Sequence, residues 1–186
     1  RRRSSTSPST LTPTVPPLAS PPRQQHARRP PPADTRTRCP AGYLYHQKDM
    51  LQDKERMDGY RCAILNNADR FEGKVVLDVG AGSGVLAIWA AMAGARKVYA
   101  VEATSMAAQA RRLIAHNGWS HVITVLEGYM EQQQIPEPVD VIVSEWMGYF
   151  LLRESMLDSV IAAVIITSSP RLTCLESHGR LRCKLA

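Results

Sequence analysis

The sequence predicts an α/β fold in which a parallel sheet of about four strands is covered by helices. Three observations lead to this fold class. Short apolar, β-branched runs alternate in the middle of the chain with longer segments of helical character. A run of glycines directly follows the first of these apolar runs. An acidic residue ends the second run, at the sheet edge where folds of this class place their binding sites.

The expected elements follow one another in a regular order. Four apolar runs are predicted as strands, at residues 74–79, 96–101, 121–126 and 139–144. Helices are predicted at residues 46–66, 85–93, 104–116 and 153–165. The first of these contains no proline and repeats its large apolar residues with helical spacing, at Met50, Met57, Tyr60 and Ile64. Gly94 and Asn117-Gly118 end the second and third helices, and Thr104 can cap the third. Strands that alternate with helices predict parallel pairing.

Charge divides the chain into three parts. Residues 1–40 carry eight arginines and one acid, and residues 167–186 carry four basic side chains and one acidic side chain. Residues 41–166 carry 11 basic and 15 acidic side chains, so the part that can fold is acidic. The net charge of +6 therefore comes from the two ends. We expect no direct nucleic-acid binding, because no basic stripe lies on the folding part.

The two ends lack a folding pattern, which leaves residues 41–166 as the expected domain. Ten of the 13 prolines fall in residues 1–40, so we expect a disordered leader rich in proline, arginine and serine. Its acid-poor composition also fits a chloroplast transit peptide, and a solvated leader or a translated non-coding stretch is the alternative. Residues 167–186 show a period of neither two nor 3.6, and we assign this tail no structure.

Cysteine usage and hydropathy indicate the compartment. The four cysteines form no CxxC pair and have no histidine at ligand spacing, so we expect reduced thiols and no bound metal. No run of 18 apolar residues occurs, and we expect no membrane partner. The chain is therefore predicted to be intracellular, in the cytoplasm or the nucleus.

The glycine loop VLDVGAGSG is the first candidate binding site. Gly80 and Gly82 let the backbone turn sharply, and the N–H groups at the start of the next helix point into the same space. Glu102 ends the second strand, where an acidic side chain can bind the two hydroxyls of a ribose. The carboxylate of Asp78 would repel a pyrophosphate but suits a ligand with an ammonium group. The pattern therefore favours S-adenosylmethionine over NAD as the cofactor.

A pair of glutamates in SEWMGYFLLRESM is the second candidate site. Glu145 and Glu154 bracket an apolar, aromatic loop at the carboxyl end of the fourth strand. Two neighbouring carboxylates repel each other, and a planar guanidinium between them removes that conflict. Trp146 and Tyr149 can line such a guanidinium slot or belong to the core. The alternative is that Glu145 merely ends a strand and Glu154 lies on a helix surface.

The motifs VLDVGAGSG, YAVEA and SEWMGYFLLRESM resemble those of the protein arginine methyltransferases. The segment YHQKDMLQDKERMDGY is similar to a plant type I member, and the resemblance runs from about residue 42 to residue 163. It implies a Rossmann-like class I methyltransferase sheet and methyl transfer from S-adenosylmethionine to arginine side chains of proteins, such as histones or Arg/Gly-rich tails. Type I members make ω-monomethyl and asymmetric dimethyl arginine.

The resemblance also implies a role for individual positions. Glu145 and Glu154 match the catalytic pair that holds the substrate guanidinium, and Met50 matches a methionine that lines the substrate pocket. The matched cofactor positions are Arg56 for the carboxylate, Asp78, Gly80 and Gly82 for the methionine end, Glu102 for the ribose, and Met130 with Glu131 for the adenine.

The chain also departs from the family pattern. CPAGYLYHQ stands where the family carries an aromatic YFxxY segment, and Gln47 aligns with its usual histidine. The family continues into a fifth strand, a threonine-histidine-tryptophan loop, a β-barrel and a dimerisation arm, for which we find no counterpart here. We therefore expect an incomplete sheet whose fourth strand is an unprotected edge. Two other interpretations stay open: a methyltransferase of another substrate class, and a non-catalytic truncated isoform or gene-model fragment that binds partners or competes with the full enzyme.

Overall fold

A parallel sheet forms the centre of the fold. The computed structural model describes residues 44–147, 156–167 and 173–175, all of which belong to one compact unit, residues 32–186. Five strands lie side by side in the order β3-β2-β1-β4-β5, and every neighbouring pair is parallel. They are β1 (Val75–Val79), β2 (Lys97–Glu102), β3 (Ile123–Glu127), β4 (Val141–Val143) and β5 (Thr173–Leu175). The predicted α/β class and parallel pairing are confirmed.

The central strand, β1, is buried along its whole length. Val76 is aligned with Val98 of β2 on one side and with Val141 of β4 on the other. A strand that is covered on both faces has apolar residues throughout, which is why VVLDV shows no alternation. Because all pairs are parallel, the carboxyl ends of β1, β2 and β4 meet at one edge of the sheet.

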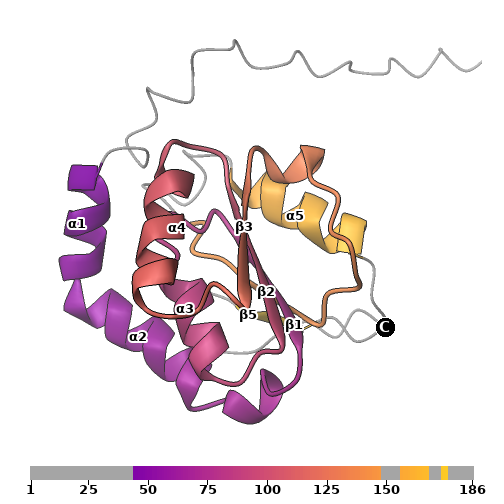
Figure 1. Ribbon diagram of the computed structural model, residues 1–186, viewed down its shortest axis with the longest axis horizontal. Helices are drawn as coiled ribbons and strands as arrows, with labels where there is room; N and C mark the ends of the chain where they lie inside the picture. The colour runs from indigo at the N-terminus through magenta and orange to yellow at the C-terminus, as the bar shows by residue number, and fades with distance from the viewer. Residues whose placement is uncertain (1–43, 148–155, 168–172, 176–186) are drawn as a thin grey trace, which may run out of the picture. The chain divides into compact units, whose positions relative to one another are not determined.

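Helices cover both faces of the sheet (Figure 1). One apolar cluster joins the sheet to α2 (Lys54–Leu65), α3 (Val85–Met92) and α4 (Met106–His116). A second cluster joins the other face to α5 (Met156–Thr167) and the short 3₁₀ helix η4 (Met130–Gln132). The remaining helices are α1 (Leu44–Gln52) and the 3₁₀ helix η3 (Ala68–Arg70). None of the helices in the described ranges is long and apolar enough to cross a membrane.

The helix predicted over residues 46–66 is two helices, because Asp53 starts a new one. Asp53 has φ −69° and ψ 90°, and its carboxylate accepts a hydrogen bond of 3.2 Å from the backbone N–H of Arg56. A short acidic side chain competes in this way for N–H groups at a helix start, and so it ends α1 and caps α2. The other predicted helices and strands agree with the structure to within a few residues, the usual uncertainty of element ends.

The predicted unprotected edge at β4 was wrong, because β5 pairs with that strand. Val141 and Val143 are aligned with Thr173 and Leu175, within the tail to which the sequence assigned no structure. A strand of three residues is too short to show a period of two, so only its pairing with β4 reveals it. The rest of the tail and the predicted leader lie outside the described residues.

Candidate functional site

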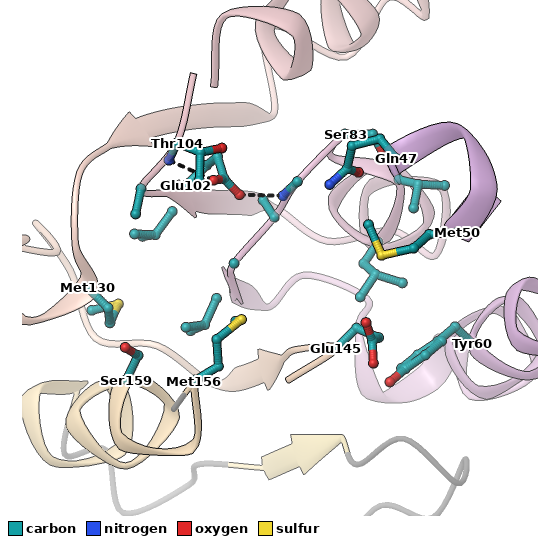
Figure 2. Close-up of a pocket in the computed structure, with 18 of the residues that line it drawn as sticks. Gln47, Met50, Tyr60, Ser83, Glu102, Thr104, Met130, Glu145, Met156 and Ser159 are labelled. Atoms are coloured by element: carbon teal, nitrogen blue, oxygen red, sulfur yellow. Dashed lines mark hydrogen bonds between the residues drawn. The ribbon is translucent and has the colours of Figure 1, made fainter. Parts of the chain in front are cut away.

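A cavity of about 470 Å³ lies at the carboxyl ends of β1, β2 and β4. Its walls come from the glycine loop after β1, the end of β2, α1, α2, the segment around η4, and α5 (Figure 2). Open parallel sheets bind their ligands at this edge, where neighbouring loops diverge. The position therefore agrees with the binding edge that the sequence predicted.

Two glycines shape the floor of the cavity. Gly80 has φ +73° and Gly82 has φ +53°, a left-handed backbone conformation that is unfavourable for residues with a Cβ atom. A Cβ atom on Gly82 would lie 2.9 Å from the Oε1 atom of Gln47, and one on Gly80 would collide with the end of Met156. The positive φ values favour glycine at both positions, and an added side chain would also have to displace the end of Gln47 or of Met156.

Glu102 is fixed at the end of β2 by two backbone hydrogen bonds. Its Oε2 atom accepts from the N–H of Gly82 at 2.7 Å, and its Oε1 atom accepts from the N–H of Thr104 at 2.8 Å (Figure 2). The residue is only 6% exposed, yet it lines the cavity. Each oxygen keeps further acceptor capacity, so the carboxylate can also receive bonds from a pair of ligand hydroxyls.

Asp78 lies beneath the glycine loop and not on the cavity wall. Its Oδ2 atom accepts a hydrogen bond of 3.1 Å from the N–H of Ala87 in α3, and the residue is completely buried. Burial raises the pKa of Asp78 to about 7, and the Glu102 carboxylate acts in the same direction while the bond from Ala87 opposes it. The Oδ1 atom has no hydrogen-bond partner among the described residues. The structure supports a role in holding the loop, and the contact with a ligand ammonium group stays a prediction.

Arg56 and Glu145 are neighbours on the wall of the cavity and form an ion pair. The Nη1 atom of Arg56 lies 3.8 Å from the Oε2 atom of Glu145, and its Nε atom lies 3.5 Å from the Oδ2 atom of Asp53. Arg56 is the one cationic side chain among the described residues that line the cavity. A ligand that carries a carboxylate therefore has a single positively charged partner there.

The structure brings some of the other predicted residues to the cavity and not others. Met50 and Met130 line it. Glu131 is exposed and does not itself line the cavity, but its carboxylate accepts a hydrogen bond of 2.8 Å from the hydroxyl of Ser159, which does; its adenine role stays a prediction. Trp146 packs against the apolar cluster of α5 and η4. Tyr149 and Glu154 lie outside the described residues.

The lining residues to which the sequence analysis assigned no site role include Gln47, Tyr60, Met156 and Ser159. Tyr60 follows Arg56 by four residues, which places both on one face of α2, and that spacing was available as a signal. Gln47 is only 7% exposed and also borders a second groove of about 530 Å³ between α1 and α4. Nothing in its sequence neighbourhood indicates a buried amide, because its burial depends on the distant glycine loop.

Comparison with known proteins agrees with this geometry. A family model described as ribosomal protein L11 methyltransferase (PrmA) matches residues 62–166. Protein arginine N-methyltransferase PRMT10 of Arabidopsis thaliana is 59% identical over 143 residues, which are 77% of this chain and 37% of that protein. The chain thus spans well under half the length of this relative.

Solved structures show the same likeness. The crystal structure of Arabidopsis thaliana protein arginine methyltransferase 10 is 60% identical with a TM-score of 0.71, and the match covers 72% of this chain and 38% of that one. The Trypanosoma brucei PRMT1 enzyme-prozyme heterotetrameric complex with AdoHcy is 46% identical with a TM-score of 0.70, over 72% and 42% of the two chains.

The residues matched by the family model include β1 to β4, the glycine loop and Glu145. The family model describes a methyltransferase domain, and the more similar relatives are arginine methyltransferases. The chain belongs to the protein arginine methyltransferase family.

Proposed function

We propose that this chain binds S-adenosylmethionine in the cavity and that the protein to which it belongs methylates arginine side chains of other proteins. One observation carries the proposal: a single cavity holds a hydroxyl-binding carboxylate, one cation and a second carboxylate. These are Glu102, Arg56 and Glu145. The names of the relatives, all arginine methyltransferases, support the same reaction.

The residues of the cavity fit the chemical groups of the cofactor. Arg56 offers a guanidinium to its carboxylate, and Glu102 offers acceptors to its ribose hydroxyls. Met130, which is 3% exposed, gives an apolar wall for the adenine. A volume of about 470 Å³ falls within the range of pockets that enclose small molecules, about 300–1,000 Å³.

Glu145 is the residue that suits a substrate guanidinium. Glu145 lies just after β4 and lines the cavity, and 25% of its side-chain surface is exposed, so a ligand in the cavity can reach its carboxylate. A carboxylate that binds two guanidinium nitrogens orients the third and draws positive charge away from it. We assign Glu154 the second half of this clamp on the resemblance.

Catalysis in this arrangement consists mainly of alignment. S-adenosylmethionine supplies a sulfonium methyl group, which is already a good electrophile. Glu145 fixes the nitrogen that attacks, and the glycine loop with Glu102 fixes the other partner, so that the two are held together in one orientation. The fixed carboxylates also stabilise the cationic reactants electrostatically. Transfer of the methyl group to a cationic guanidinium gives a doubly charged and therefore strongly acidic group, so one proton passes readily to solvent and the methylated product keeps a single positive charge.

The finer features of the function are also proposals. We propose arginines of histones or Arg/Gly-rich tails as substrates, and the heterotetramer of the trypanosome relative supports work as an oligomer. We place the reaction in the cytoplasm or nucleus, with the chloroplast as the alternative if residues 1–40 act as a transit peptide.

Calorimetry followed by a methylation assay tests the proposal. The 186-residue chain is titrated with S-adenosylmethionine and then incubated with labelled cofactor and an arginine-rich peptide, with a lysine-substituted peptide as the control. We expect saturable binding and label only on the arginine peptide. Absence of binding at millimolar cofactor contradicts the cofactor site. Binding without transfer favours the non-catalytic interpretation, and transfer to the lysine peptide favours another substrate class.

A further inference from the structure

Arg56 and Glu145 serve different ligands in the proposed function, yet their side chains are in contact. The distance of 3.8 Å joins Nη1 of Arg56 to Oε2 of Glu145. Figure 2 shows Glu145 at the end of β4, with its carboxylate inside the ring of lining residues. The residue that we assign to the cofactor and the residue that we assign to the substrate therefore form an ion pair with each other in this structure.

Arg56 does not need Glu145 to stay in place. Asp53 caps α2 by accepting from the backbone N–H of Arg56 at 3.2 Å, and its other carboxylate oxygen lies 3.5 Å from Nε of the same residue. One edge of the guanidinium is thus held by the helix to which it belongs. Its far end is the part that reaches Glu145 and the cavity.

The cofactor's carboxylate must approach this same far end. Among the described residues that line the cavity, no other cation is available. When that carboxylate arrives, it is the third negative group around Arg56, after Asp53 at 3.5 Å and Glu145 at 3.8 Å, and its repulsion from Glu145 offsets part of its attraction to Arg56. The contact with Arg56 therefore opposes cofactor binding as long as Glu145 remains charged and unneutralised.

We propose that Glu145 competes with the cofactor's carboxylate for Arg56 and weakens binding of that carboxylate until a substrate guanidinium binds Glu145. This inference rests on the proposed function and deepens it. An arginine substrate at Glu145 removes the competing charge and leaves Arg56 to the cofactor. By thermodynamic linkage, the bound cofactor raises the affinity of Glu145 for the guanidinium by the same factor. Each ligand thus favours the binding of the other.

The alternative is that Glu145 strengthens, rather than weakens, binding of the cofactor's carboxylate. If Glu145 instead orients Arg56 toward the cofactor, loss of the Glu145 charge weakens the cofactor's carboxylate contact. Measuring that contact alone separates the two cases. Decarboxylated S-adenosylmethionine keeps the sulfonium and the ammonium group but lacks the carboxylate, so the ratio of the two dissociation constants isolates the carboxylate's contribution.

The first experiment measures this ratio in the 186-residue chain and in two variants by calorimetry. Glu145→Gln removes the competing charge while keeping the shape of the side chain. Glu72→Gln removes the same charge at an exposed position remote from the cavity and serves as the matched control. We expect the preference for the carboxylate-bearing cofactor to rise about fivefold or more in Glu145→Gln, at the low end of measured site couplings. Glu72→Gln leaves the preference unchanged.

A second measurement needs no variant and covers the case in which Glu145→Gln does not fold. Methylguanidinium, added to the unaltered chain, neutralises Glu145 and strengthens binding of S-adenosylmethionine but not of its decarboxylated form. An unchanged or lower preference in both experiments overturns the inference and leaves the cofactor site intact. If neither cofactor binds the unaltered chain, the inference and the proposed function are both contradicted.

Discussion

Glu102 and Glu145 are two carboxylates of one cavity, but the protein holds them in different ways. Glu102 is buried and accepts backbone hydrogen bonds of 2.7 and 2.8 Å from Gly82 and Thr104. Glu145 keeps a quarter of its side-chain surface exposed and meets Arg56 at the longer distance of 3.8 Å. The end of the cavity around Glu102, to which we assign the ribose and which we call the ribose end, is fixed by backbone groups, whereas the other end is held by an ion pair between side chains.

Folding alone therefore fixes the position of the Glu102 carboxylate, whereas we expect bound ligands to influence the position of the Glu145 carboxylate. Ordering a side chain before binding removes that entropic cost from the binding step, and the ribose end is built in this way. The charged end is held by the Arg56–Glu145 ion pair, whose two members we assign to different ligands. The following variants test this contrast by one common measurement, the free energy of unfolding in urea, from the largest expected effect to the smallest.

Glu102→Ala is expected to destabilise the chain most, by about 3 kcal/mol, because two backbone N–H groups lose their acceptor. Cofactor affinity falls with it, by at least about 100-fold, which corresponds to about 3 kcal/mol. Glu127→Ala is the matched control, since Glu127 is aligned with Glu102 on the neighbouring strand but forms only an exposed pair with Arg111. Equal losses for the two variants contradict a fixed ribose end.

Gly82→Ala is expected to cost about 2 kcal/mol, through the positive φ and the contact with Gln47. Gly73→Ala separates these causes, because Gly73 has φ +68° and no atom within 4 Å of an added Cβ. It should cost only the backbone strain, about 1 kcal/mol. If both variants lose the same amount, Gln47 moves aside without cost and does not hold α1 on the loop.

Asp78→Asn tests the buried carboxyl beneath the loop. The folded chain raises the pKa of Asp78 to about 7 from 3.8, so between these values the folded state holds a proton that the unfolded state has lost. Stability therefore falls as pH rises from about 4 to 7, and this penalty persists above pH 7. Asparagine carries no charge, so the free energy of unfolding of the variant should rise relative to that of the parent chain as pH rises, by about 1 kcal/mol or more at pH 8.

The measurement is a series of urea unfolding curves for both chains between pH 5 and pH 8. Glu131→Gln, at an exposed carboxylate, is the charge control and should show no such trend. A difference between parent and Asp78→Asn that stays constant across the series means that Asp78 does not titrate in this range.

Arg56→Gln is expected to change stability least, within about 0.5 kcal/mol, because partly exposed ion pairs contribute little. Its effect on cofactor binding should be much larger, a loss of about tenfold or 1.4 kcal/mol. Unfolding and calorimetry on one preparation compare the two. A stability loss as large as that of Glu102→Ala shows that both ends of the cavity are fixed by folding.

The sequence predicted the parts of the site that depend on local pattern. Gly80, Gly82 and Glu102 stand at the ends of apolar runs, and strand ends that are parallel must meet at one edge. Arg56 came from the resemblance alone, and its contact with Glu145 joins residues that no local pattern connects. The break at Asp53 was missed, although an acidic residue before a helix start is a common capping signal, because the apolar periodicity of residues 46–66 continues across it.

Residues whose position depends on tertiary packing could not be predicted. Gln47 is buried only because α1 lies over the glycine loop, and β5 exists only because β4 offers an apolar edge. The burial of Asp78 under the loop and its bond to Ala87 were also not predicted, and its contact with a ligand ammonium group stays a prediction. Strand position along the sequence determines which sheet edge a residue reaches, but not on which side of a loop its side chain lies.

The strand order β3-β2-β1-β4-β5 also governs how the chain folds during synthesis. Of these strands β1 leaves the ribosome first and can pair with β2, to whose far side β3 then adds. The other side of β1 stays unpaired until β4 is synthesised, about 60 residues later, and that synthesis takes about 3–12 s at typical translation rates. During that interval Val76 and Leu77 present an open apolar edge, so chaperone capture of the nascent chain is expected just before β4 emerges.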